Sequence, residues 1–188
     1  CNTIRLYSFQ TDVVYQVLKR DGVCYSKEEY VRKKYKESAK VFINAYGWFV
    51  KEAQHIVPKP EGAEYPYWAF TDLYNVDQTG DGHVLTLDVP IGEAILFDMF
   101  DWTKIMQMHY IGENESEEAT FSEELKNMGM NEFQIMTSNF YPEQKARIQE
   151  SWKRLFGHQQ AIEAGDNSGV HSVQAGLWCI KDEWIVKE

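Results

Sequence analysis

Residues 4–22, with the sequence IRLYSFQTDVVYQVLKRDG, constrain the fold of this chain more than any other stretch. The first half alternates between two sets of side chains, and a period of two predicts a strand with two different faces. One set is Ile4, Leu6 and Ser8, and the other is Arg5, Tyr7 and Phe9. The second half carries an apolar stripe at helical spacing, formed by Val13, Val14, Val17 and Leu18. A strand that passes directly into a helix is the predicted start of the fold.

Polar groups gather at the junction between this strand and helix. Thr11 is placed to cap the helix, and Asp12 carries a negative charge in the first turn, where the helix dipole favours it. Ser8 and Gln10 stand at the end of the strand, beside the first free N–H groups of the helix. Helix N-termini of this kind bind anions. The junction is a candidate wall of a binding cleft, and an ordinary structural unit is the alternative interpretation.

The rest of the chain predicts a single α+β domain over residues 1–188, with a small mixed or antiparallel sheet and flanking helices. Strands are predicted at residues 65–71, 84–89, 94–97 and 172–180. Helices are predicted at residues 26–55, with a break near Ser38 as an alternative to one continuous helix, and at residues 101–110 and 142–157. Residues 113–124 contain six glutamates and no basic residue. We therefore expect an acidic linker or flap near residues 112–124, and a mainly helical segment over residues 120–157.

Composition excludes several classes of function. The formal net charge is −10 at pH 7 and the pI is about 5.0, which argues against broad, charge-driven binding of nucleic acid. No run of apolar residues is long enough to span a membrane, so a soluble protein is expected. Cys1, Cys24 and Cys179 cannot all pair and have no metal-binding spacing, which fits a reducing cytoplasm. An opening at Cys1 without Met is typical of a processed end or an expression remnant.

One segment has the spacing of a calcium-binding loop. In DQTGDGHVLTLD, Asp77, Thr79 and Asp81 occupy ligand positions one, three and five, and Asp88 occupies position twelve. A strand and Pro90 follow, however, where the second helix of an EF-hand would begin. We therefore favour a glycine-rich turn between two strands and expect no metal. The five histidines are scattered, and no nucleophile elbow, P-loop or dinucleotide-binding glycine motif occurs.

Five segments occur in the order of a bacterial family known as domain of unknown function 3841, and the resemblance covers most of the chain. The segments are IRLYSFQ, YPYWAF, VLTLDVP leading into ILFDMFDW, ARIQESWKRLF and SVQAGLWCI. The chain departs from the family pattern at Gly157, where an acidic residue is expected, and in the tryptophan-containing segment after Asp98. The resemblance implies no established activity.

At the level of fold, the chain also resembles the ADP-ribosyltransferase superfamily. Those domains begin with a strand ending in a polar motif and a helix closing at a glycine, as in LYSFQ and LKRDG here. Their last key strand bears a catalytic carboxylate, whereas the comparable position here is Gln174. An amide can neither act as a general base nor stabilise a cationic transition state as a carboxylate does. Catalysis would need a carboxylate from elsewhere, such as Asp72 or Asp88.

The sequence therefore predicts a cleft for a nucleotide-type ligand, with NAD as the candidate cofactor. The side-chain amides of Gln10 and Gln174 would make hydrogen bonds with the edge of the ligand, and Tyr67 or Trp68 would stack on its flat ring. The predicted lining residues are Tyr7, Ser8, Gln10, Tyr67, Trp68 and Gln174. The alternative is a non-enzymatic interaction or regulatory protein whose acidic segment, residues 113–124, meets a basic protein partner. Both hypotheses leave open whether the protein is an enzyme.

Overall fold

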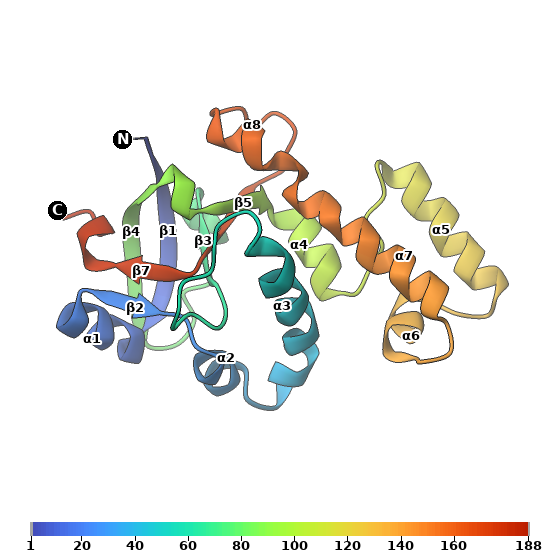
Figure 1. Ribbon diagram of the computed structural model, residues 1–188, viewed down its shortest axis with the longest axis horizontal. Coiled ribbons are helices and arrows are strands. Elements are labelled where there is room, and N and C mark those ends of the chain that lie inside the picture. Colours follow the sequence, from blue (N-terminus) through green and yellow to red (C-terminus); the bar gives the residue numbers. More distant parts are fainter. Residues whose placement is uncertain (1, 188) are drawn as a thin grey trace.

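The computed structural model describes residues 2–187, and for residues 38–41 it describes the backbone only. Its centre is a five-stranded antiparallel sheet in the order β4-β1-β3-β6-β5, with β2 and β7 forming a separate two-stranded sheet (Figure 1). The strands are β1 (Thr3–Thr11), β2 (Val23–Tyr25), β3 (Tyr67–Phe70), β4 (Gly82–Pro90), β5 (Ile95–Asp98), β6 (Val173–Leu177) and β7 (Cys179–Lys181). The predicted α+β class, with a small antiparallel sheet and flanking helices, is confirmed.

Alternation along β1 divides the five-stranded sheet into two faces. β1 pairs with β4 along its whole length, with Leu6 opposite Leu87 and Tyr7 opposite Thr86. Leu6 and Leu87 are fully buried against the first helix, so we name this side the α1 face. Tyr7 and Thr86 lie on the other side, which we name the α3 face. The alternation predicted for the strand at residues 4–9 is confirmed.

Helix α1 (Asp12–Asp21) packs on the α1 face. Val14 and Leu18 are its buried residues and share a core with the two-stranded sheet. Gly22 ends the helix with φ of 78° and donates its N–H to the Leu18 carbonyl, as its sequence position predicts. Thr11 stands at the N-cap, but its side chain makes no capping hydrogen bond, so that part of the prediction is wrong.

Helices α3 (Ala39–Ala53) and α4 (Met99–Met106) pack on the α3 face. Their rings meet those of the sheet: Phe49 lies 5.1 Å from Trp68, and Trp102 lies 4.8 Å from Trp68, between ring centroids. This core takes sheet residues from β3 and β5 but none from β1 or β4. Tyr7 and Thr86 are accordingly only half-buried. The α3 face is thus covered over one half and open over the other.

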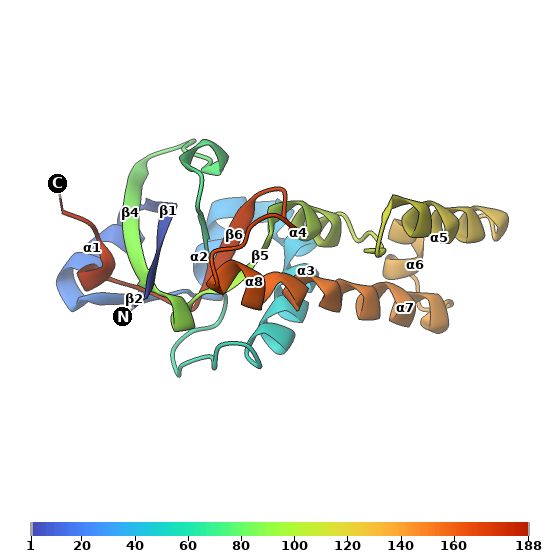
Figure 2. The same ribbon diagram turned by 90° about the horizontal axis from the view of Figure 1, so that it is seen from above.

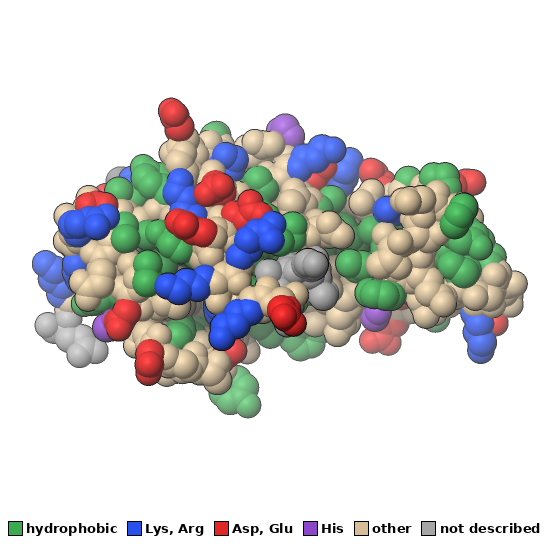
Figure 3. Space-filling model, turned by 90° about the horizontal axis from the view of Figure 1, so that it is seen from below, with side chains coloured by type: hydrophobic (Ala, Val, Ile, Leu, Met, Phe, Trp, Pro, Cys, Tyr) green, Lys and Arg blue, Asp and Glu red, His purple; other side chains and the backbone are tan. Residues whose placement is uncertain are grey.

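The helices α5 (Glu115–Asn127), α6 (Glu132–Thr137) and α7 (Pro142–Trp152) form one end of the molecule, beyond the sheet (Figures 1 and 2). We name these three helices the helical lobe. Its core consists of Phe121, Leu125, Ile135 and Ile148, all buried. Figure 3 shows hydrophobic side chains gathered at this end, where Met128, Phe133 and Phe140 are exposed. Most of the acidic segment lies in α5, and Pro142 occupies the first turn of α7 as predicted.

Two local predictions are wrong. Residues 172–180 were expected to form one strand, but the chain passes at Trp178 from β6 in one sheet to β7 in the other. The helix predicted from residue 26 begins at Glu28, because the Ser26 hydroxyl donates to the Pro66 carbonyl instead of capping. The remaining helical elements are α2 (Glu28–Tyr35), η1 (Lys36–Ser38), η2 (Leu73–Asn75), η3 (Ile91–Glu93), η4 (Lys153–His158), α8 (Gln159–Glu163) and η5 (Asp182–Trp184).

The close approach of α3 to β6 predicts the effect of a single methyl group. A Cβ on Gly176 would lie 2.9 Å from Phe49 Cζ and 3.4 Å from Trp68 Cζ3, in a fully packed core. We expect Gly176→Ala to lower the free energy of unfolding by about 1–3 kcal/mol through overpacking. Gly47→Ala is the control, because its Cβ meets nothing within 4 Å and should stabilise α3 by about 0.5–1 kcal/mol. Urea unfolding of both variants measures the two free energies of unfolding. Equal changes in Gly176→Ala and Gly47→Ala would contradict the prediction.

Candidate functional site

The structure divides the six predicted site residues between the two faces of the sheet. Tyr7, Trp68 and Gln174 lie on the α3 face, as the pairing of β1, β3 and β6 requires. The other three, Ser8, Gln10 and Tyr67, lie on the α1 face. The six residues therefore cannot line a single cleft. Each group of three is described separately below.

The three residues on the α1 face are held by hydrogen bonds within the fold. The Ser8 hydroxyl donates to the Trp68 carbonyl at 2.6 Å, and the Gln10 amide donates to Ser8 Oγ at 2.8 Å. The Tyr67 hydroxyl donates to the Tyr25 carbonyl at 3.2 Å. Burial raises the pKa of the Tyr67 hydroxyl, so it stays protonated. These groups stabilise the strand pairing and leave little hydrogen-bonding capacity for a ligand.

A histidine joins this junction at the surface. His83 lies opposite Gln10 on β4, and its Nε2 makes a hydrogen bond with the Asp12 carboxylate in the first turn of α1. Tyr15 stacks on the His83 ring with centroids 3.9 Å apart. The junction is therefore polar, as predicted, but its outer groups bind one another. The sequence contained no signal for this pair, because the two residues are far apart in the chain.

The α3 face carries a row of side chains across all five strands. The strand register places Thr86, Tyr7, Phe70, Gln174 and Phe97 side by side in that order. We name this the cross-sheet row. It runs from the open half of the face, at Tyr7, to the covered half, at Phe97. Gln174 stands at the boundary between the two halves.

Gln174 is the one residue of the cross-sheet row with unused polar groups in a buried setting. The residue is only 3% exposed, yet its side chain makes no hydrogen bond within the described residues. Every fully buried side-chain nitrogen or oxygen among residues 2–187 does have a partner. The Gln174 amide must therefore reach the molecular surface through a narrow opening. A buried amide that ends at an opening can bind a ligand with complementary donors and acceptors.

Trp68 forms the covered wall beside this amide. Its indole N–H donates to the Tyr46 hydroxyl at 2.9 Å, and its ring packs edge-on against Phe49. Burial raises the pKa of Tyr46, so its hydroxyl stays protonated while its oxygen accepts this hydrogen bond. The Trp68 ring is consequently held against the core by these contacts, although Trp68 is itself half-buried. Tyr7 and Phe70, which are half-buried, are the rings of the cross-sheet row with free surface.

The two carboxylates that might have served catalysis are engaged elsewhere. Arg5 contacts Asp88 through two hydrogen bonds of 2.6 and 3.2 Å, and this contact lowers the pKa of Asp88. Asp72 caps η2 by accepting the N–H of Tyr74 at 2.9 Å. Asp88 therefore does not join the turn at residues 77–81, where Asp77 accepts the Thr79 N–H. Within residues 2–187, no group of three or more His, Cys, Asp or Glu side chains is placed to hold a metal.

The structure also reveals an aspartate–histidine pair that sequence reasoning missed. Asp98, only 3% exposed, accepts the N–H of Phe100 at 3.0 Å and two hydrogen bonds from His171, at 3.1 Å from its N–H and 3.0 Å from Nδ1. Burial alone would raise the pKa of Asp98, but the hydrogen bonds from His171 and Phe100 lower it. The His171 ring stacks on Phe100, and the His171 side chain is 69% exposed. An N-cap aspartate after a buried strand was the available sequence signal.

A second aspartate–histidine pair involves the first turn of α4. Asp101 faces His158 at 3.6 Å, and its side chain is 15% exposed. Burial, and then the charge of Asp98, raise the pKa of Asp101. An exposed imidazole held by a buried carboxylate has the arrangement of a general base. Neither pair lines the cavity at Trp178 or the hollow beside Asp182, and Asp98 caps the start of α4 by accepting the Phe100 N–H.

A family model described as a domain of unknown function, DUF3841, matches residues 5–186. The chain belongs to this family. The matched residues include the five-stranded sheet, the cross-sheet row and the helical lobe, so the DUF3841 domain comprises the whole architecture described above. No curated protein and no solved structure matches the chain. Among the described residues of this DUF3841 domain, no helix is long and apolar enough to cross a membrane.

Asp98, the N-cap of α4, and Asp101, in the first turn of α4, should affect stability in opposite directions. We expect Asp98→Ala to lower the free energy of unfolding by about 2 kcal/mol at pH 7, through loss of a cap and of charge-assisted hydrogen bonds. Because the folded pKa of Asp98 is lowered, this contribution is complete above the ordinary value of 3.8 and is lost as pH falls through the folded pKa.

Asp101→Asn is the matched control on the same helix. Because the folded pKa of Asp101 is raised, its charge opposes folding at neutral pH, and removing it should leave stability unchanged or higher. Urea unfolding between pH 3 and pH 7 follows both variants. The assignment is wrong if Asp98→Ala costs as much at the acid end as at pH 7, or if Asp101→Asn is the more damaging change.

Proposed function

We propose that the DUF3841 domain binds a small ligand with a flat, nucleotide-type ring, such as NAD, on the open half of the α3 face. The observation that carries the proposal is the amide of Gln174, which has no hydrogen-bond partner among the described side chains and stands at the boundary between the covered and the open half. Phe70 stands next to it in the cross-sheet row and Tyr7 stands beyond Phe70, and both rings have free surface for stacking. The Gln174 amide would make hydrogen bonds with the polar edge of the ligand ring, and Tyr7 and Phe70 would stack on the flat face of that ring.

The arrangement of strands supports an ADP-ribosyltransferase-like form of this proposal. The first strand, the aromatic middle strand and the late strand that bears Gln174 are neighbours, in the order β1-β3-β6. In that superfamily the corresponding late strand supplies a carboxylate. Gln174 cannot act as a base, and Asp88, which could approach from β4, is held by Arg5. We therefore propose binding without transferase chemistry.

The alternative, an interaction protein with an acidic surface, has less support. Four of the six glutamates at residues 113–124 form ion pairs inside the protein: Glu113 and Glu117 with Arg154, Glu118 with Lys104, and Glu124 with Arg147. Little of this charge is left to attract a basic partner. A reducing, cytoplasmic location remains part of our proposal, and the free, buried thiols of Cys24 and Cys179 support it.

A thermal-shift screen against NAD, adenosine nucleotides and nicotinamide tests the proposal. A ligand at about one hundred times its Kd adds about 2.7 kcal/mol, or roughly 5–10 °C in Tm for a chain of this length. We expect Gln174→Met to abolish that shift. Without ligand, the same variant should unfold at an equal or higher temperature, because methionine fits the space and removes an unpaired amide.

Gln10→Met is the matched control, since it changes a glutamine to methionine on the opposite face of the same sheet. It should lose the hydrogen bond to Ser8 and some stability but keep the ligand-induced shift. A screen in which no nucleotide shifts the wild-type protein rejects the proposal. So does a ligand whose effect survives in Gln174→Met and disappears in Gln10→Met.

A further inference from the structure

A cavity of about 180 Å³ lies between the two-stranded sheet and the loop that follows α3. It shares no residue with the cross-sheet row. Its apolar walls are two tryptophans, a tyrosine, two prolines and a valine: Trp178, Trp184, Tyr25, Pro58, Pro60 and Val57. Pockets for drug-sized ligands measure roughly 300–1,000 Å³, so this one suits a smaller molecule with an apolar body. We name it the Trp178 pocket.

The walls of the Trp178 pocket are fixed by hydrogen bonds. The Trp178 indole N–H donates to the Val57 carbonyl at 2.8 Å, which ties the loop to the strand segment. Tyr25 lies opposite Cys179 in the pairing of β2 with β7. Lys27 donates to the Gly62 carbonyl and holds the far end of the loop. A pocket that is already formed requires little ordering when a ligand binds.

Two opposite charges stand at the edge of this pocket. Lys181 Nζ and Glu93 Oε1 are 3.9 Å apart, and the two side chains are 36% and 43% exposed. Neither forms a hydrogen bond with any other side chain or backbone group in residues 2–187. Lys181 also lies over the Trp184 ring, 5.7 Å from its centre. A pair this long and this exposed contributes little to stability, so both groups keep their hydrogen-bonding capacity.

We propose that the Trp178 pocket binds a free α-amino acid with an aromatic or branched side chain. Lys181 would bind the carboxylate and Glu93 the ammonium group, each by charge-assisted hydrogen bonds. The apolar side chain would enter between the tryptophans and the prolines. A zwitterion fits because its two charges are as close together as those of Lys181 and Glu93. A ligand with only a carboxylate would give Glu93 no positively charged group to bind. A ligand with only an amine would give Lys181 no negatively charged group to bind.

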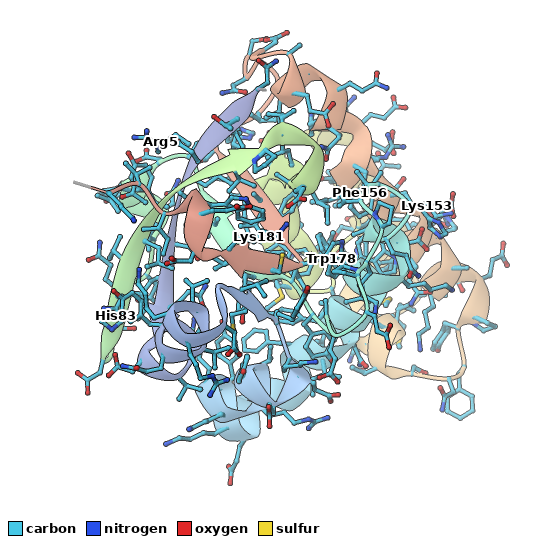
Figure 4. All side chains as sticks on the ribbon, turned by 60° about the vertical axis from the view of Figure 1, so that its left-hand side comes forward. Arg5, His83, Lys153, Phe156, Trp178 and Lys181 are labelled. Atoms are coloured by element: carbon cyan, nitrogen blue, oxygen red, sulfur yellow. The ribbon has the colours of Figure 1, made fainter. Side chains whose placement is uncertain are left out.

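The thiol in the wall fits binding without covalent chemistry. Burial raises the pKa of Cys179 to about 11, so the thiol is protonated and unreactive at neutral pH. In Figure 4, Trp178 and Lys181 lie at the segment around β7, whereas Lys153 lies farther from Lys181, on the helical segment after α7. Lys153 is paired with Glu150 and provides a control for loss of one positive charge.

Calorimetry and tryptophan fluorescence with L-phenylalanine, 3-phenylpropionate and phenethylamine test this proposal. We expect L-phenylalanine to bind with a Kd of about 1 mM or below. The carboxylate-only and amine-only analogues should bind at least tenfold more weakly. Lys181→Met and Glu93→Gln should each weaken L-phenylalanine binding about tenfold, whereas Lys153→Met should not.

The outcomes separate this proposal from the nucleotide proposal. Gln174→Met should bind L-phenylalanine as the wild type does. Absence of L-phenylalanine and L-leucine binding at millimolar concentration overturns the proposal. Equal binding of a single-charge analogue overturns it as well, because the charge pair then plays no part. Thermal unfolding of each variant without ligand is the control for folding. We expect Lys181→Met and Glu93→Gln to unfold at the temperature of the wild type, because both side chains are partly exposed.

Discussion

Alternation along the strands of the central sheet decides which side chains of this protein can meet. Successive strand residues point to opposite faces, so Tyr7 and Ser8 are adjacent in the chain but separated by the sheet. The register across the strands then joins residues that are far apart in sequence, as where Phe70 stands between Tyr7 and Gln174. Each face is therefore a separate chemical environment. The α1 face holds satisfied polar groups, and the α3 face holds the unpaired amide.

The local patterns predicted the strands and the direction of their side chains well. At residues 4–9 and 84–89 a period of two is enough to assign each side chain to one of the two faces, because the direction of a side chain in a strand depends on the local backbone. The same pattern already shows that Tyr7 and Ser8 cannot line one cleft. The predicted six-residue site combined the two faces because it was chosen by residue type at strand ends. Register across the sheet has no local signal, so only the structure shows the cross-sheet row.

Features that depend on distant partners could not be predicted. Residues 172–180 contain no break that divides β6 from β7, and the division results from contacts of neighbouring residues. Trp178 donates to Val57, while Cys179 pairs with Tyr25 in the other sheet. The acidic segment is a similar case. Its composition indicates a solvated chain, but the basic partners that pair with it come from α4 and from residues 147–154.

Two glutamines of the central sheet region show why unpaired polar groups point to ligands here. Gln159 is buried, accepts the Leu96 N–H at 2.7 Å and donates to the Ala94 carbonyl at 3.0 Å. It thereby satisfies the free edge of β5, and its role in the fold is complete. Gln174 is also buried, but its side-chain amide makes no hydrogen bond within the described residues. A leucine or methionine would fill its position at no cost in hydrogen bonds, so the fold alone gives no reason for an amide there, whereas a polar ligand on the α3 face does.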